Sequence, residues 1–181
     1  MEGYYWIKRG KNMFNEAKKI FEKYKGNYFQ MDRDNILEIY KSYHVPQKLE
    51  KEWINDQIFA LQDDLKECLN KKKIVEDMEL LGHYVSISKN KKGLYYMIQY
   101  IDDKKEIIDS NTLLRCINAC ISNMNFLKEK DRQVLIGKLV WILKTHLKND
   151  VFISDDYKID GKFPDYLTTE RVKEALCNLI N

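Results

Sequence analysis

Apolar side chains recur along most of this chain at intervals of three and four residues, which places them on one face of an α-helix. The first run consists of Met13, Ala17, Ile20 and Tyr24. Gly26 and Asn27 follow it, and both residue types tolerate the left-handed backbone that commonly ends a helix. The pattern therefore predicts a first helix over 12–25.

Two further helices are predicted between residues 35 and 70. Asn35 and Glu38 have the spacing of a capping box, in which each side chain satisfies a free amide, so a short second helix should begin there. Pro46 can open a helix because it has no amide to leave unpaired. An apolar stripe then follows, formed by Ile54, Ile58, Leu61, Leu65 and Leu69. It predicts a third helix over 46–70, the longest of the chain.

The stretch over 74–101 fits two different structures. Residues 84–88 alternate between polar and apolar, and 89–93 could turn a hairpin into a second strand over 94–101. Both halves also have helical spacing, at Ile74, Met78, Leu81 and Val85 and again at Leu94, Met97, Ile98 and Ile101. Two helices separated at Gly93 are favoured, because an isolated hairpin is marginally stable in water.

The pattern stays helical over most of the remaining chain. Ser110 is predicted to cap a helix whose apolar arc contains Leu113, Cys116, Ile117, Cys120, Ile121 and Met124. The next helix, over 131–147, has an apolar arc wide enough for several neighbours and is predicted to be the central helix. No period is evident over 149–167, which makes that segment a candidate functional loop. Thr168 is predicted to cap a last helix.

These elements predict an all-α fold, a compact array of about seven or eight helices in a single domain over 1–181. Only two prolines and seven glycines interrupt the pattern, fewer than the regular turns of a sandwich or barrel require. The alternative is a mostly α fold with one β-hairpin near 84–101.

Composition indicates the surroundings of the protein. The longest apolar run, over 134–143, contains Lys138 and falls short of the roughly 20 residues that span a bilayer. Lys8 and Arg9 follow the first apolar patch, the reverse of a secretory signal, so we expect a cytoplasmic protein without membrane contact. The four cysteines are scattered, which favours reduced thiols over disulfides.

The charge pattern offers one candidate binding surface. The net charge is only +3, and Arg, the residue preferred for bidentate phosphate contacts, is scarce. The polar side of the predicted helix over 131–147 nevertheless carries Trp141 and, around it, Lys138, Lys144 and Lys148. A base could stack on the indole while the ammonium groups hold phosphates, and Lys18 and Lys19 could extend the surface. In the alternative, the indole packs against another helix beneath the lysine stems.

Other candidate chemistry lies on the apolar faces and in the irregular segment. His146 falls on the apolar arc of the helix over 131–147, which predicts either a pocket residue or a core histidine with a hydrogen-bond partner. Cys116 and Cys120 share an apolar helix face and are predicted to pack in the core rather than bind a metal. A calcium-loop pattern over 156–160 fails because Lys158 occupies a ligand position.

The sequence contains no glycine-rich phosphate loop, nucleophile elbow or paired metal-ligand spacing, which argues against catalysis and predicts no cofactor and no metal. We expect a non-enzymatic binding protein, a regulator, adaptor or immunity-type partner whose mixed-charge surface and exposed tyrosines recognise another protein. The alternative is a helical protein that binds or processes nucleic acid through Trp141 and its lysines. An enzyme built around His146 is a third class.

Overall fold

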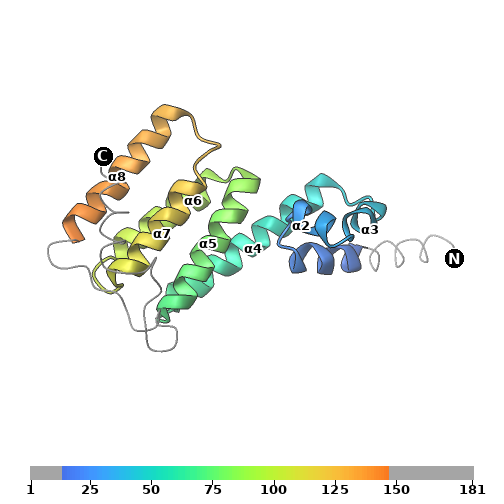
Figure 1. Cartoon of the computed structure of the whole chain (residues 1–181), viewed down its shortest axis with the longest axis horizontal. Helices are drawn as coiled ribbons and strands as arrows, with labels where there is room; N and C mark the ends of the chain where they lie inside the picture. Colours follow the sequence, from blue (N-terminus) through green and yellow to red (C-terminus); the bar gives the residue numbers. More distant parts are fainter. Residues whose placement is uncertain (1–13, 147–181) are drawn as a thin grey trace. The chain divides into compact units, whose positions relative to one another are not determined.

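The structure, a computed structural model, describes residues 14–146, and these residues fold into α-helices with no strand among them (Figure 1). A first helix covers 14–23 of the described residues. It is followed by α2 (Tyr28–Arg33), α3 (Leu37–Ser42), α4 (Gln47–Glu67), α5 (Lys71–Ser88), α6 (Lys91–Lys104), α7 (Ser110–Ser122) and α8 (Glu129–His146). The predicted all-α fold is confirmed, and the hairpin near 84–101 is wrong because α5 and α6 cover that stretch.

Contacts group the chain into two compact units, Met1–Gln57 and Ile58–Asn181, and the boundary between them falls within α4. The single domain over 1–181 stays a prediction. The candidate loop over 149–167 and the helix capped by Thr168 lie outside the described residues.

The first unit packs its described helices around one aromatic side chain, Phe21. The ring centroid of Phe21 lies 6.1 Å from that of Tyr40 and 5.5 Å from that of Trp53, which brings the helix over 14–23 against α3 and α4. Ala17 and Met31 are fully buried in the same unit. Aromatic pairs at these separations add attraction beyond the apolar area that they bury.

Residues with a left-handed backbone conformation connect the helices of this unit. Lys25 and Gly26 have φ angles of 54° and 67°, which confirms the predicted left-handed end at Gly26, whereas Asn27 has an extended backbone and is the N-cap of α2. The predicted capping box is wrong, because α3 has Ile36 as its N-cap without a side-chain hydrogen bond. Asn35 instead adopts a φ of 58° between α2 and α3. Asn tolerates this conformation, so it serves the turn and not the start of the next helix.

The helix α4 spans 21 residues and is the longest of the described helices, as predicted. Its start is also confirmed, because the Pro46 carbonyl accepts the amides of Leu49 and Glu50 at 2.9 and 3.2 Å. The end was placed too late, since the helix stops at Glu67 and Leu69 is 81% exposed.

The two predicted helices between 71 and 104 are confirmed, but their boundary is not at Gly93. Lys89 ends α5 with a left-handed φ of 54°, and the side chain of Asn90 begins α6 by accepting the amide of Gly93 at 3.0 Å. Gly93 therefore lies in the first turn of α6. Glycine allows α6 to approach Val85 closely at this position, because a Cβ there would meet Cγ2 of Val85 at 2.6 Å.

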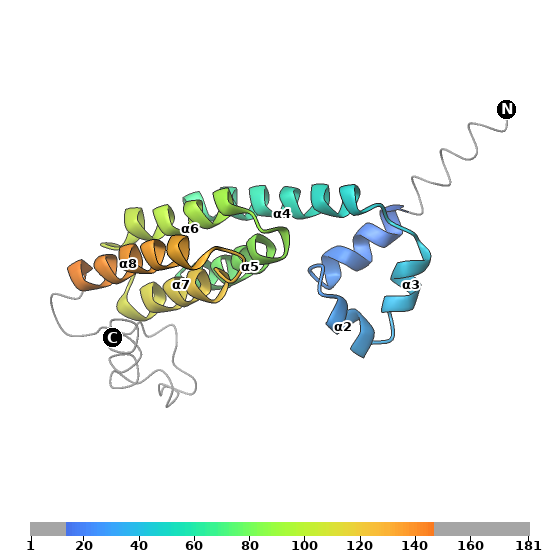
Figure 2. The same ribbon diagram turned by 90° about the horizontal axis from the view of Figure 1, so that it is seen from above.

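The centre of the second unit is formed by α5, α6 and α7, which pack against one another (Figure 2). The prediction that the helix over 131–147 is central is wrong for the described residues: α5 and α7 bury most of their apolar side chains, whereas Val134 and Trp141 of α8 are exposed. α8 buries a narrower stripe formed by Leu135, Leu139 and Ile142. The wide apolar arc of this helix suggested contact with several neighbouring helices, but only part of the arc is buried among the described residues.

The cap of α7 is one residue earlier than predicted. Asp109 Oδ1 accepts the amide of Thr112 at 2.8 Å, and Ser110 is the first helical residue. The Asp109 side chain is 2% exposed, and its Oδ2 lies 3.4 Å from the ammonium of Lys71. The Asp109 carboxylate thus caps the start of α7 and also forms an ion pair with a lysine of α5.

Two helical glycines should respond to alanine substitution with opposite signs. Gly93→Ala should lower the free energy of unfolding by about 1 to 2 kcal/mol, because the contact with Val85 outweighs the gain in helix propensity. Gly137→Ala should raise it by about 0.5 to 1 kcal/mol, since a Cβ there meets no heavy atom within 4 Å. Denaturant unfolding measures both, and equal stabilisation by the two substitutions would contradict the close contact at Gly93.

Candidate functional site

One side of α8 presents an exposed strip that we call the Trp141 face, formed by Val134, Gly137, Lys138 and Trp141. Val134 is 66% exposed and the indole of Trp141 is 56% exposed, so the alternative in which the indole packs beneath another helix is wrong. Gly137 leaves open space between the two side chains. Spacings of three and four residues align all four positions along one side of the helix.

Two of the lysines around the Trp141 face have acidic neighbours. Lys138 Nζ lies 3.8 Å from a carboxylate oxygen of Asp102 in α6, and Lys91 Nζ of α6 lies 3.6 Å from Asp131 of α8. These ion pairs join α6 and α8 and reduce the positive field that phosphate groups would meet. Lys148 lies outside the described residues, and the side chain of Lys144 is also not described.

The lysines predicted to extend this surface belong to the first unit. Lys18 Nζ lies 3.8 Å from Glu22 and 4.0 Å from Asp56, and Lys19 Nζ lies 2.7 Å from Glu16. Both lysines line a shallow depression whose walls also include Glu16 and Glu22. Lys18 and Lys19, like Lys138, therefore each have an acidic neighbour.

His146 is the last described residue of α8 and is partly exposed. Its Nδ1 atom is buried and has no hydrogen-bond partner within the described part of the chain. It lines neither the depression beside Lys18 and Lys19 nor the pocket described below. A role for this imidazole in a pocket stays a prediction.

The two cysteines of α7 lie in the core, as predicted. Cys116 and Cys120 are both fully buried. Burial raises the pKa of the Cys116 thiol to about 12 and also raises that of Cys120, so both stay protonated at neutral pH. Among the residues of the described range, no group of three side chains is arranged to hold a metal ion.

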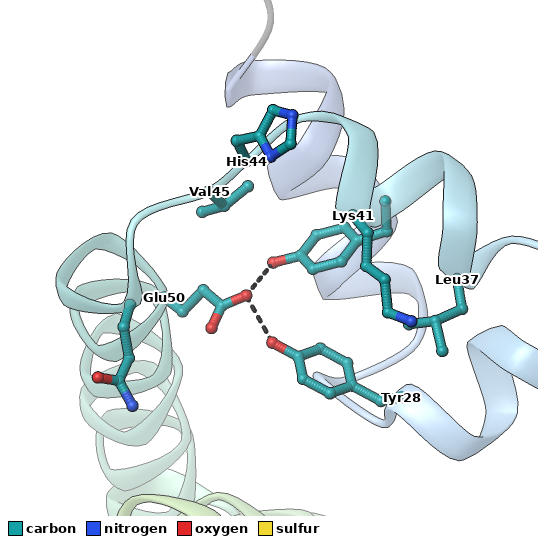
Figure 3. Close-up of a pocket in the computed structure, with 8 residues that line it drawn as sticks. Tyr28, Leu37, Lys41, His44, Val45 and Glu50 are labelled. Atoms are coloured by element: carbon teal, nitrogen blue, oxygen red, sulfur yellow. Dashed lines mark hydrogen bonds between the residues drawn. The ribbon is translucent and has the colours of Figure 1, made fainter.

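The first unit contains a pocket that sequence patterns did not predict. It has a volume of about 280 Å³, and we call it the tyrosine pocket (Figure 3). Its lining comes from α2, α3, the α3–α4 connection and the first turn of α4, and consists of Tyr28, Leu37, Tyr40, Lys41, His44, Val45, Gln47 and Glu50. His44 makes the connection possible with a left-handed φ of 47°.

Two phenols meet one carboxylate in this pocket (Figure 3). The hydroxyl groups of Tyr28 and Tyr40 donate to the same oxygen of Glu50, Oε1, over 2.5 and 2.6 Å. The pKa of both phenols lies well above the usual value for tyrosine. Burial is the main cause, and the hydrogen bonds to Glu50 are the second. The phenols therefore remain donors throughout the neutral pH range.

No signal in the sequence pointed to this pocket. Tyr28 lies in α2, a helix that apolar spacing does not predict, and Tyr40 has the position of an ordinary apolar residue in α3. Glu50 is one of many acids on an amphipathic helix. The three side chains meet only because α2 and α3 pack against the start of α4, which is a long-range property of the fold.

Comparison with known proteins gives no match among family models, curated proteins or solved structures. The described helices also include none with the length and apolar character needed to cross a lipid bilayer. Function must therefore be inferred from the surfaces and side chains of this chain.

Proposed function

We propose that this chain is a non-enzymatic binding protein of the cytoplasm that recognises another protein through the Trp141 face. The observation that supports this function is the exposure of Trp141 and Val134 on one side of α8, with open space at Gly137 between them. Large aromatic side chains are enriched among the residues that dominate binding energy at protein interfaces. The partner that fits is a folded protein with an apolar groove for the indole.

The electrostatic surroundings favour a protein partner over nucleic acid. Acidic and basic side chains both lie near the face: Lys138 has Asp102 as a neighbour at 3.8 Å, and Lys91 has Asp131 at 3.6 Å. A mixed-charge rim around an apolar centre is typical of protein interfaces. Nucleic-acid surfaces instead concentrate uncompensated basic side chains.

Substitution of the indole tests the proposal. Trp141→Ala should weaken binding to the partner by about 2 kcal/mol, or roughly thirtyfold, because the substitution removes the main apolar contact. The full chain would be used to recover partners from host lysate before and after nuclease treatment, and the affinity of the recovered protein would then be measured by calorimetry.

Tyr95→Ala is the matched control, since Tyr95 is 55% exposed on α6 and lies outside the Trp141 face. It should leave the affinity within about twofold, a change typical of residues outside an interface hot spot. Equal affinities for Trp141→Ala and the unmodified chain would remove the Trp141 face from the proposal.

Nucleic acid is the second candidate, and the specific observation in its favour is the exposed indole beside Lys138. Bases stack on such rings while ammonium groups contact phosphates. An oligonucleotide would then quench tryptophan fluorescence with an affinity that falls steeply as salt is raised. Loss of all captured material after nuclease treatment would favour this candidate over a protein partner.

A further inference from the structure

The tyrosine pocket contains a cluster of hydrogen-bond acceptors. Each phenol has one O–H group, and both Tyr28 and Tyr40 donate it to Glu50 Oε1. Each phenolic oxygen therefore keeps lone pairs with which to accept a further hydrogen bond. Glu50 Oε2 makes no hydrogen bond to the described residues that line the pocket. The cluster can bind a donor, but it has no remaining O–H group to offer an acceptor.

The negative charge of this cluster has no counter-ion from the pocket wall. Lys41 lines the pocket, but its ammonium donates to Glu38 at 2.8 Å and lies beside Leu37, away from the Glu50 carboxylate (Figure 3). Within residues 14–146, no ion pair joins Glu50 to a cationic side chain. A partly buried carboxylate without a cation keeps an electrostatic cost that a bound cation would relieve.

The pocket has both the room and the apolar lining for the carbon chain of an alkylammonium ion. A volume of about 280 Å³ is ample for an unbranched four-carbon chain. Leu37 and Val45 supply apolar contact for such a chain, and the Tyr28 ring attracts a positive charge through its face. A primary ammonium group carries three N–H donors and no acceptor, which matches the phenolic oxygens of Tyr28 and Tyr40 together with Glu50 Oε2.

We infer that the tyrosine pocket binds a protonated primary amine carried on an unbranched alkyl chain. The ammonium group lies against Glu50 and the two phenolic oxygens, and the alkyl chain lies along the apolar wall. This site belongs to the first unit, whereas the Trp141 face belongs to the second, so either can fail without the other. The amine can come from a small molecule or from a lysine side chain of another protein.

Titration of the full chain with n-butylamine at neutral pH tests this inference. With tyrosine rings labelled with carbon-13, n-butylamine should shift the signals of Tyr28 and Tyr40 with a dissociation constant of about 1 to 10 mM, typical of a ligand with few atoms. Tyr28→Phe and Tyr40→Phe assign the two signals. 1-Butanol, which has the same chain without the charge, should bind at least about tenfold more weakly.

Variants in the first unit separate the site from general electrostatic attraction. Glu50→Gln should weaken butylammonium binding at least about tenfold, because the carboxylate charge is lost. Glu52→Gln removes the same charge from an exposed position of α4 outside the pocket lining, and it should leave binding within about twofold. Equal binding by these two variants, or equal binding of butylamine and butanol, would overturn the inference.

Tyr28→Phe provides a second measurement if Glu50→Gln does not fold. Tyr28 is 44% exposed, so the substitution should be tolerated, and it removes one acceptor while keeping the carboxylate. Butylammonium should then bind about threefold to tenfold more weakly, as expected for the net contribution of one typical hydrogen bond. An unchanged affinity would contradict the arrangement of three acceptors.

The source of the amine is distinguished by comparing 1,4-diaminobutane with a lysine capped as its N-acetyl methylamide. Binding of the capped lysine at least as tightly as butylamine supports a protein side chain as the natural ligand. Binding of the diamine but not of the capped lysine supports a small-molecule amine as the natural ligand. Absence of shifts with all three amines up to about 100 mM, well above the expected range, would overturn the site itself.

Discussion

Leu113→Ala should lower the free energy of unfolding by about 2 to 5 kcal/mol. Leu113 is fully buried on α7, the helix that packs against both α5 and α6. Truncation to alanine loses the transfer free energy of the removed groups and leaves a cavity that a well-packed core only partly fills. Urea denaturation followed by circular dichroism at 222 nm, the usual helix signal, measures the change.

Asn118→Ala on the exposed side of α7 is the control for this substitution. It should leave stability unchanged or raise it by a few tenths of a kcal/mol, because alanine has the higher helix propensity. A loss for Leu113→Ala as small as the effect of this control would mean that α7 does not lie at the centre of the second unit.

Asp109→Ala should lower the free energy of unfolding by about 2 to 4 kcal/mol. The substitution removes the N-cap hydrogen bond to Thr112 and leaves Lys71 without the carboxylate that lies 3.4 Å from its ammonium. Asp109→Asn separates these two contributions, since an amide oxygen can still cap the helix but carries no charge. The same denaturation experiment measures both variants.

Ser110→Ala distinguishes the observed cap from the one expected from sequence. Ser110 is the first residue within α7, so this variant should cost well under 1 kcal/mol. A larger loss for Ser110→Ala than for Asp109→Ala would show that the helix begins one residue later than the structure indicates.

Apolar spacing was sufficient to predict most of the helical architecture. The recurrence of Leu94, Met97, Ile98 and Ile101, together with the marginal stability of an isolated hairpin, favoured a helix over a strand at 94–101, and all four side chains are buried on α6. Cys116 and Cys120 were likewise assigned to the core because their neighbours on the same face are apolar. Periodicity is reliable for these helices because burial of one face is what stabilises a short helix.

Helix boundaries were harder to predict because neighbouring residues compete for the same cap. Asp109 and Ser110 both have oxygen-bearing side chains suited to an N-cap, and only the backbone decides which one accepts the Thr112 amide. Asn35 could either cap α3 or adopt a left-handed turn, and it does the latter. In both cases the local sequence allows two favourable arrangements, and it does not distinguish the one that the fold adopts.

The candidate sites show a different limit of sequence reasoning. The pattern placed Trp141 beside Lys138 on the polar side of α8 but left open whether the indole would be exposed or packed, and the structure shows that it is 56% exposed. Val134 lies seven residues before Trp141, on the same side of the helix, and its side chain is exposed as well. The tyrosine pocket depends on distant residues such as Tyr28 and Glu50 meeting in space, and no local pattern encodes that meeting.

The buried thiols of α7 can report how often the helices around them separate. Cys116 is sealed from solvent and held in its protonated form, so an alkylating reagent reaches it only when the surrounding helices separate. The rate at which iodoacetamide modifies Cys116, followed by mass spectrometry of the peptide, therefore measures how often this core opens. A ligand or partner that slows the modification has stabilised the closed state, even when it binds far from the cysteine.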